Sequence, residues 1–133
     1  MKLFYSAFCI IACLTITGCS KDKTNNTDVV KKLTGADSGK TTAVTQGQTL
    51  TVTLGNPGDG GYQFDGPKFS ASVLTLVNHT HQAGNANMIG DFGTDTWKFT
   101  ASKTGTTTLE ITASRSFEAN SNVAMFSGQI TVQ

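Results

Sequence analysis

The sequence predicts an all-β protein, a small antiparallel β-sandwich without a disulfide. From about residue 41 onward, apolar and polar residues alternate in one run after another, which is typical of strands with one buried face. Thr, Ser and Gly are frequent where a helical bundle would need Ala, Leu, Glu and Lys. The 133 residues suffice for one domain, and a hydrophobic content of 38% can build a small core, which argues against a disordered chain.

The N-terminal segment is typical of a bacterial lipoprotein. Lys2 precedes a short apolar run that ends at Cys19, so residues 1–18 are predicted to be a signal peptide. The small residues before Cys19 resemble a lipobox, at which this cysteine would be acylated, palmitate being a typical chain. We expect the lipid to anchor the protein in the bacterial cell envelope, at the outer membrane or the cell surface. Residues 20–133 contain no cysteine, which excludes a disulfide or a thiolate nucleophile there.

Residues 19–40 are polar and contain no aromatic side chain. We interpret them as a flexible tether between the lipid and a domain at residues 41–133. The apolar residues Val29, Val30 and Leu33 are compatible with a brief strand or a turn of helix within this tether.

The strands of the domain follow from the period-two alternation. Four clear runs cover residues 49–54, 97–101, 108–113 and 126–132. Their predicted core residues are Leu50, Val52, Leu54, Trp97, Phe99, Ala101, Leu109, Ile111, Ala113, Phe126, Gly128, Ile130 and Val132. Residues 73–77 form a further run whose buried face the pattern leaves open. With Gly-rich turns between the runs, about seven short strands fit an immunoglobulin-like sandwich.

Residues that carry enzyme chemistry are scarce, so the sequence predicts a protein that is not an enzyme and uses no cofactor. His79 and His81 share one face if they lie on a strand, but a zinc site needs a third protein ligand, and no cysteine or third histidine supplies it. Turn chemistry accounts for the aspartates in the Gly-rich segments, so no metal site is predicted. The formal net charge of +1 provides no field that would attract nucleic acid.

Three turn segments hold the informative residues. They are Asn56-Pro57-Gly58-Asp59-Gly60-Gly61-Tyr62, Gly90-Asp91-Phe92-Gly93 and Arg115-Ser116-Phe117. In this order on a β-sandwich, they resemble the chagasin family of proteinaceous cysteine-peptidase inhibitors. That family has Asn-Pro-x-x-Gly-Tyr in its first loop, a Gly-rich second loop and Arg-Pro-Trp in its third. The likeness covers most of residues 41–133.

The resemblance implies a monomeric, reversible and non-covalent inhibitor whose partner is a papain-like cysteine peptidase. Three loops would block the active-site cleft, with Phe117 supplying apolar area and Arg115 a cation at the rim. The chain departs from the family pattern in two loops. The first is one residue longer and lacks the Thr pair of many relatives, and the third has neither Pro nor Trp. These departures bear on affinity and target range.

Two other functions are compatible with the sequence. A lipid-anchored adhesion or assembly module would use the same sandwich without a peptidase partner. A metal carrier of the periplasm or cell surface would use His79 and His81. Titration of papain separates inhibition from the adhesion module, because only an inhibitor removes the enzyme's activity stoichiometrically.

Overall fold

The computed structural model describes residues 29–133, so the predicted signal peptide, Cys19 and the beginning of the predicted tether lie outside the described residues. Eight strands and two short 3-10 helices form this part of the chain. They are β1 (Lys31–Thr34), η1 (Gly35–Asp37), β2 (Thr41–Val44), β3 (Thr49–Gly55), η2 (Asp59–Gly61), β4 (Gln63–Phe64), β5 (Leu74–Gln82), β6 (Thr94–Ala101), β7 (Gly105–Ser114) and β8 (Val123–Val132). No helix among these elements is long and apolar enough to cross a membrane.

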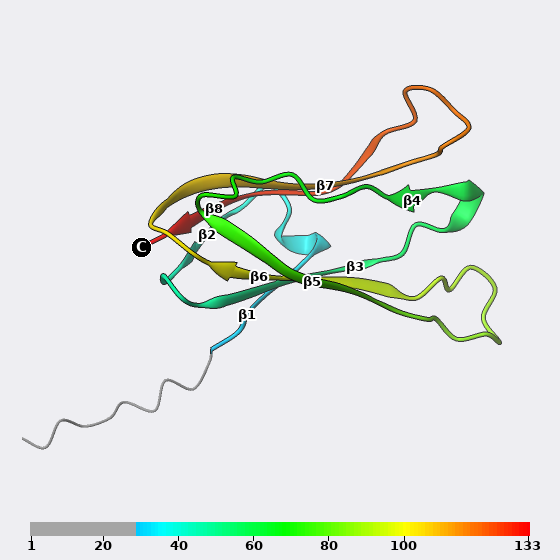
Figure 1. Ribbon diagram of the computed structural model, residues 1–133. Helices are drawn as coiled ribbons and strands as arrows, with labels where there is room; N and C mark the ends of the chain where they lie inside the picture. The colour runs from blue at the N-terminus through cyan, green and yellow to red at the C-terminus, as the bar shows by residue number, and fades with distance from the viewer. Residues whose placement is uncertain (1–28) are drawn as a thin grey trace, which may run out of the picture.

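Two four-stranded sheets form the layers of the sandwich (Figure 1). The first sheet has the order β1-β3-β6-β5 and the second the order β2-β8-β7-β4. This confirms the predicted all-β sandwich. The sheets are mixed rather than purely antiparallel, however, because β1 pairs with β3, and β2 with β8, in parallel. Alternation shows which face of a strand is buried but not its direction, so the sequence did not indicate these parallel edge pairs.

The core lies between the sheets and is built from the predicted rows of inward side chains. Every residue of those rows is buried, and the largest fully buried side chains are Trp97, Phe99 and Phe126. Phe64 and Phe69 add edge-to-face contacts with Trp97 and Phe99, with ring centroids 4.7 and 5.3 Å apart. Burial of each large side chain contributes about 1.5–3 kcal/mol before the cost of chain entropy.

A β-bulge explains why residues 73–77 showed no clear buried face. Val73 and Leu74 are buried, whereas Leu76 and Val77 are exposed. The register between β5 and β6 shifts between Leu76 and Asn78, as expected where one strand carries an extra residue. Beyond the bulge, β5 continues to Gln82, well past the predicted end of the run.

The folded domain begins earlier than the sequence predicts. Residues 31–34 pair with β3 in parallel, with Leu33 opposite Val52, and Leu33 is only 4% exposed. Gly39 then donates a backbone hydrogen bond of 2.7 Å to Ser127 in the second sheet. Residues 31–40 are therefore part of the domain rather than of a flexible tether. Only one side chain of this four-residue strand is buried, so the alternation is too short to predict a strand from the sequence.

Leu33→Ala should lower the free energy of unfolding by about 2–5 kcal/mol, because it leaves a cavity in the core. Lys32→Ala, on the exposed side of the same strand, should change it by no more than about 0.5 kcal/mol. Chemical denaturation of the protein and both variants measures the difference. Equally small effects of the two substitutions would show that this segment is a tether and not part of the folded domain.

Candidate functional site

Three connections lie together at one end of the sandwich, opposite to the end where β1 begins and where the chain terminates (Figure 1). The first loop, residues 56–62, joins β3 to β4 and so crosses from one sheet to the other. The second loop, residues 83–93, closes the β5–β6 hairpin of the first sheet. The third loop, residues 115–122, closes the β7–β8 hairpin of the second sheet. The first loop is therefore flanked by a hairpin loop from each sheet.

All the predicted loop residues lie at this end and differ in how far they reach into solvent. The exposed ones are Asp59, Gly60, Gly61, Gly90, Asp91, Phe92, Ser116 and Phe117. Those that are half-buried at the base of the loops are Asn56, Pro57, Gly58, Tyr62, Gly93 and Arg115. The surface thus presents the glycines of the first loop at its centre and one aromatic ring from each flanking loop.

Glycine at two positions lets the first loop approach its neighbours closely. A Cβ atom at Gly58 would lie 2.7 Å from Cδ1 of Phe92 in the second loop. Gly61 has a φ of +80°, and a Cβ atom there would lie 2.9 Å from Cε1 of Phe117 in the third loop. Any larger residue would push these rings away, and at Gly61 it would also strain the backbone. The glycines therefore join the three loops into one continuous surface.

Exposed apolar side chains gather on the two flanking loops. Phe117 is 74% exposed and Phe92 41%, and the second loop adds Met88 at 61% and Ile89 at 107%. Single apolar residues on a surface are common, but four on adjoining loops are typical of a protein-binding patch. The sequence predicts Phe92 and Phe117 as binding residues but not Met88 and Ile89. The reason is that the glycines mark only the C-terminal part of the second loop.

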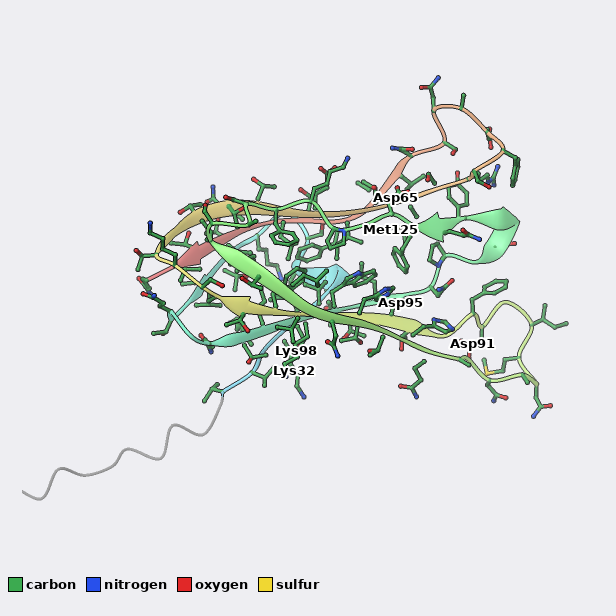
Figure 2. All side chains as sticks on the ribbon, in the orientation of Figure 1. Lys32, Asp65, Asp91, Asp95, Lys98 and Met125 are labelled. Carbon is green, nitrogen blue, oxygen red and sulfur yellow. The ribbon has the colours of Figure 1, made fainter. Side chains whose placement is uncertain are left out.

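Asp91 organises the second loop from within, and Figure 2 shows it inside the loop. Its carboxylate accepts backbone N–H groups of Asn85 at 2.8 Å and of Gly93 at 3.0 Å. These two hydrogen bonds lower the pKa of Asp91, with that from Asn85 contributing most. Asp91 is thus a structural acceptor that fixes the loop carrying Met88 and Ile89.

Arg115 ties the third loop to the first. Its guanidinium carbon lies 4.3 Å from the centroid of the Tyr62 ring, and Nη1 donates a 2.8 Å hydrogen bond to Oε2 of Glu118. The Glu118 hydrogen bond raises the pKa of Arg115, against the opposing effect of desolvation. Its backbone N–H also donates to Oγ of Ser121 at 2.8 Å, which closes the loop. The predicted rim cation therefore has partners within the protein and braces the C-terminal side of the first loop.

Asp95 lies at the root of the first loop, on β6 at the loop end of the first sheet (Figure 2). Its Oδ1 accepts a hydrogen bond of 2.7 Å from Nε2 of His79. Its Oδ2 accepts two more, from Nδ1 of His81 at 3.0 Å and from Nδ2 of Asn56 at 2.6 Å. Each imidazole must present an N–H here, because an ionised carboxylate only accepts. Asp95 thus gathers donors from β5 and from the first residue of the first loop.

The carboxyl group of Asp95 is held in its ionised form despite its position. Its side chain is 4% exposed, and burial alone would raise its pKa. Hydrogen bonds from His81, Asn56 and His79 outweigh burial, so that the pKa is lowered below its usual range. The ring of His79 also stacks on the core residue Trp97, with centroids 4.6 Å apart and an interplanar angle of 1°.

A signal for this network is present in the alternation pattern of β6. Asp95 is in phase with the inward residues Trp97 and Phe99, and strict alternation places it on the core side of β6. Asp95 is thus not a turn residue like the other aspartates of the Gly-rich segments, and His79 and His81, which share one face of β5, both contact it. Within residues 29–133, no three His, Cys, Asp or Glu side chains are grouped so that they could hold a metal ion.

The arrangement agrees with what is found in known proteins. Residues 43–132 match the family described as chagasin family peptidase inhibitor I42. The structure is similar to that of the cysteine protease inhibitor EhICP2 from Entamoeba histolytica, with a TM-score of 0.65 and 16% identity over 78% of this chain and 95% of that one. It also resembles PbICP-C in complex with falcipain-2, with a TM-score of 0.53 and 14% identity over 77% and 99% of the two chains.

A further similar structure is the solution structure of Amebosin, with a TM-score of 0.52 and 22% identity over 77% of this chain and 97% of that one. No curated protein is similar enough in sequence to match the chain. At these identities the solved structures establish the fold, whereas the family match spans nearly all of the described domain. The family is one of peptidase inhibitors and EhICP2 is a cysteine protease inhibitor, which agrees with the prediction that this protein is not an enzyme. The chain belongs to the chagasin family of peptidase inhibitors.

Proposed function

We propose that this protein is a reversible, non-covalent inhibitor of papain-like cysteine peptidases and blocks the active-site cleft with its three loops. The observation that carries the proposal is the continuous surface of these loops, in which a Gly-rich central loop lies between exposed aromatic side chains. Family membership supports a peptidase as the partner. The structural neighbour PbICP-C was solved in complex with falcipain-2, which supports a protein partner for this chain as well.

The shape of the first loop suits a narrow cleft. Its tip, Asp59–Gly61, forms a single 3-10 turn without a bulky side chain. Phe92 and Phe117 stand on either side of it and would contact the two walls of the cleft. Aromatic side chains supply large contact area at a low entropic cost, so these two residues are the expected anchors.

The same loop is a poor substrate for the enzyme that it would block. Gly60 and Gly61 have φ values of +64° and +80°, so the chain turns back at the point of deepest insertion. An extended backbone, which would present a peptide bond along the cleft, is absent from this tip. Residues 20–133 contain no cysteine that could attack or be attacked in a disulfide exchange. Inhibition therefore rests on steric exclusion.

The site of action that we propose is the bacterial cell envelope, with the protein held as a monomer by a lipid on Cys19. This part of the proposal rests on the lipobox-like sequence before Cys19. The three loops lie at the end opposite to the start of β1 (Figure 1). An anchor that precedes β1 would therefore leave the loops facing away from the membrane, where they can reach a peptidase.

Titration of papain with the protein should remove the peptidase activity stoichiometrically and reversibly. Papain whose catalytic cysteine carries a small alkyl group should still bind, because the steric mechanism needs no covalent bond. Binding is measured by calorimetry and activity with a fluorogenic substrate. An unchanged papain rate at micromolar protein would contradict inhibition, and steady cleavage between Asn56 and Tyr62 would contradict the steric mechanism.

Phe117→Ala should weaken the inhibition of papain by about 1–3 kcal/mol, the range of a moderate interface hot spot. Because Phe117 is 74% exposed, its loss should cost far less stability than the roughly 3–5 kcal/mol of a buried Phe. Val77→Ala is the matched control, since Val77 is exposed on β5 outside the three loops. A fall in melting temperature without loss of inhibition would make Phe117 a packing residue.

Cys19→Ser should abolish stable membrane attachment, because the acyl chains supply most of the membrane affinity. Detergent phase partitioning of the protein expressed in bacteria measures the attachment. Partitioning of the variant into the detergent phase like the unsubstituted protein would show that Cys19 is not the anchor.

A further inference from the structure

We propose that Asp95 is a positioning residue for the first loop, which it holds in its inhibitory shape through Asn56. The inference rests on the proposed function and concerns Asp95, a residue outside the chagasin-like loop motifs. Asp95 is buried, and Asn56 is its only hydrogen-bond partner within the first loop, so it acts on the loop through Asn56.

Asn56 connects the buried carboxylate to the turn of the loop. Its Nδ2 donates to Oδ2 of Asp95 at 2.6 Å, while its Oδ1 accepts the backbone N–H of Gly58 at 2.9 Å. Its own backbone N–H donates to the carbonyl oxygen of Gly93 at 2.8 Å. The amide is thus fixed at both ends, and its orientation determines where Gly58 lies. Because Gly58 packs against Phe92, it also determines how the first loop meets the second.

The chemistry of Asp95 suits this task better than that of a neutral side chain. Three donors, from His79, His81 and Asn56, converge on its two oxygens, and a carboxylate accepts all of them without offering a competing donor. With a side chain only 4% exposed, the group has little water to replace a lost partner. The hydrogen bonds from His79 and His81 fix the orientation of the Asp95 carboxylate. The carboxylate in turn fixes the orientation of the Asn56 amide, because only its NH2 group can donate to Oδ2.

A loop fixed before binding loses less conformational entropy on entering a cleft. The C-terminal side of the first loop is braced by Arg115 on Tyr62, and Asp95 supplies the corresponding support on the N-terminal side. Loss of this support would free the turn at Gly58 while the sheets remain paired. The expected signature is therefore weaker inhibition together with a locally mobile Gly58.

Asp95→Asn tests the proposal, because it keeps the size of the side chain but replaces one of the two acceptor oxygens with an N–H donor that faces other donors. Hydrogen exchange of the Gly58 amide in the free protein, followed by NMR, should accelerate by about tenfold or more, and the inhibition constant for papain should rise by a similar factor. Asp37→Asn is the matched control, since Asp37 accepts the Thr34 N–H and contacts Lys40 in the β1–β2 connection. It should leave Gly58 exchange and inhibition within about twofold of the parent protein.

The double variant Asn56→Asp with Asp95→Asn should restore both properties, because it reverses the direction of the hydrogen bond between the two positions. A carboxylate at position 56 still accepts the Gly58 N–H, and it accepts from the amide now at position 95. In the double variant His81 must carry its proton on Nε2, so that its Nδ1 accepts from that amide. A purely structural effect of Asp95 on the sheet would not be rescued by a change in the loop.

Unchanged Gly58 exchange in Asp95→Asn, or no recovery in the double variant, would overturn the proposal. If Asp95→Asn does not fold, Asn56→Asp alone gives the test, since it keeps an acceptor for the Gly58 N–H but removes the donor to Asp95. Unchanged Gly58 exchange in that variant would likewise overturn the proposal. Gly58 exchange is measured without a peptidase. If the unsubstituted protein fails to inhibit papain, the proposed function is refuted. The exchange rate of the Gly58 amide still shows whether Asp95 positions the first loop.

Discussion

The passage of the chain from one sheet to the other at the loop end is the constraint on which the binding surface depends. β3 ends at Gly55 in the first sheet and β4 starts at Gln63 in the second, so residues 56–62 must bridge two layers whose usual separation is about 10 Å. A bridge of this length has no strand partner of its own for most of its course. It is held instead from both layers, by Asp95 on the first sheet and by Arg115 next to the second.

Core and binding surface are continuous along a single strand. On β6, the inward row that buries Phe99 and Trp97 ends in Asp95, so that hydrophobic packing gives way to hydrogen bonding where the sandwich meets the first loop. His79 takes part in both, because it stacks on Trp97 and donates to Asp95. The rigid core thereby supports a loop in which three of the seven residues are glycines with no side chain to pack. Preorganisation of this kind lets a Gly-rich loop act as a defined wedge.

Much of the fold could be predicted from the sequence because the signals are local. Alternation identifies the buried rows, and turn residues with an ordered set of loop motifs indicate where the surface lies. What could not be predicted depends on partners far apart in the chain. Leu33 is buried only because β1 pairs with β3. The guanidinium of Arg115 packs over the ring of Tyr62 from another loop. Asn56 donates a hydrogen bond to Asp95, 39 positions away in the chain. The bulge after Leu76 and the full extent of the second loop likewise follow from pairing with β6.

The central claim is that the three loops alone form the contact surface for a papain-like peptidase. Hydrogen–deuterium exchange of the protein with and without alkylated papain, read by mass spectrometry, tests it most directly. Protection confined to residues 56–62, 83–93 and 115–122, with both sheets unchanged, is the result that the account predicts. Protection centred on the exposed edge of β5 or on the outer faces of the sheets, with the loops still exchanging freely, would contradict it.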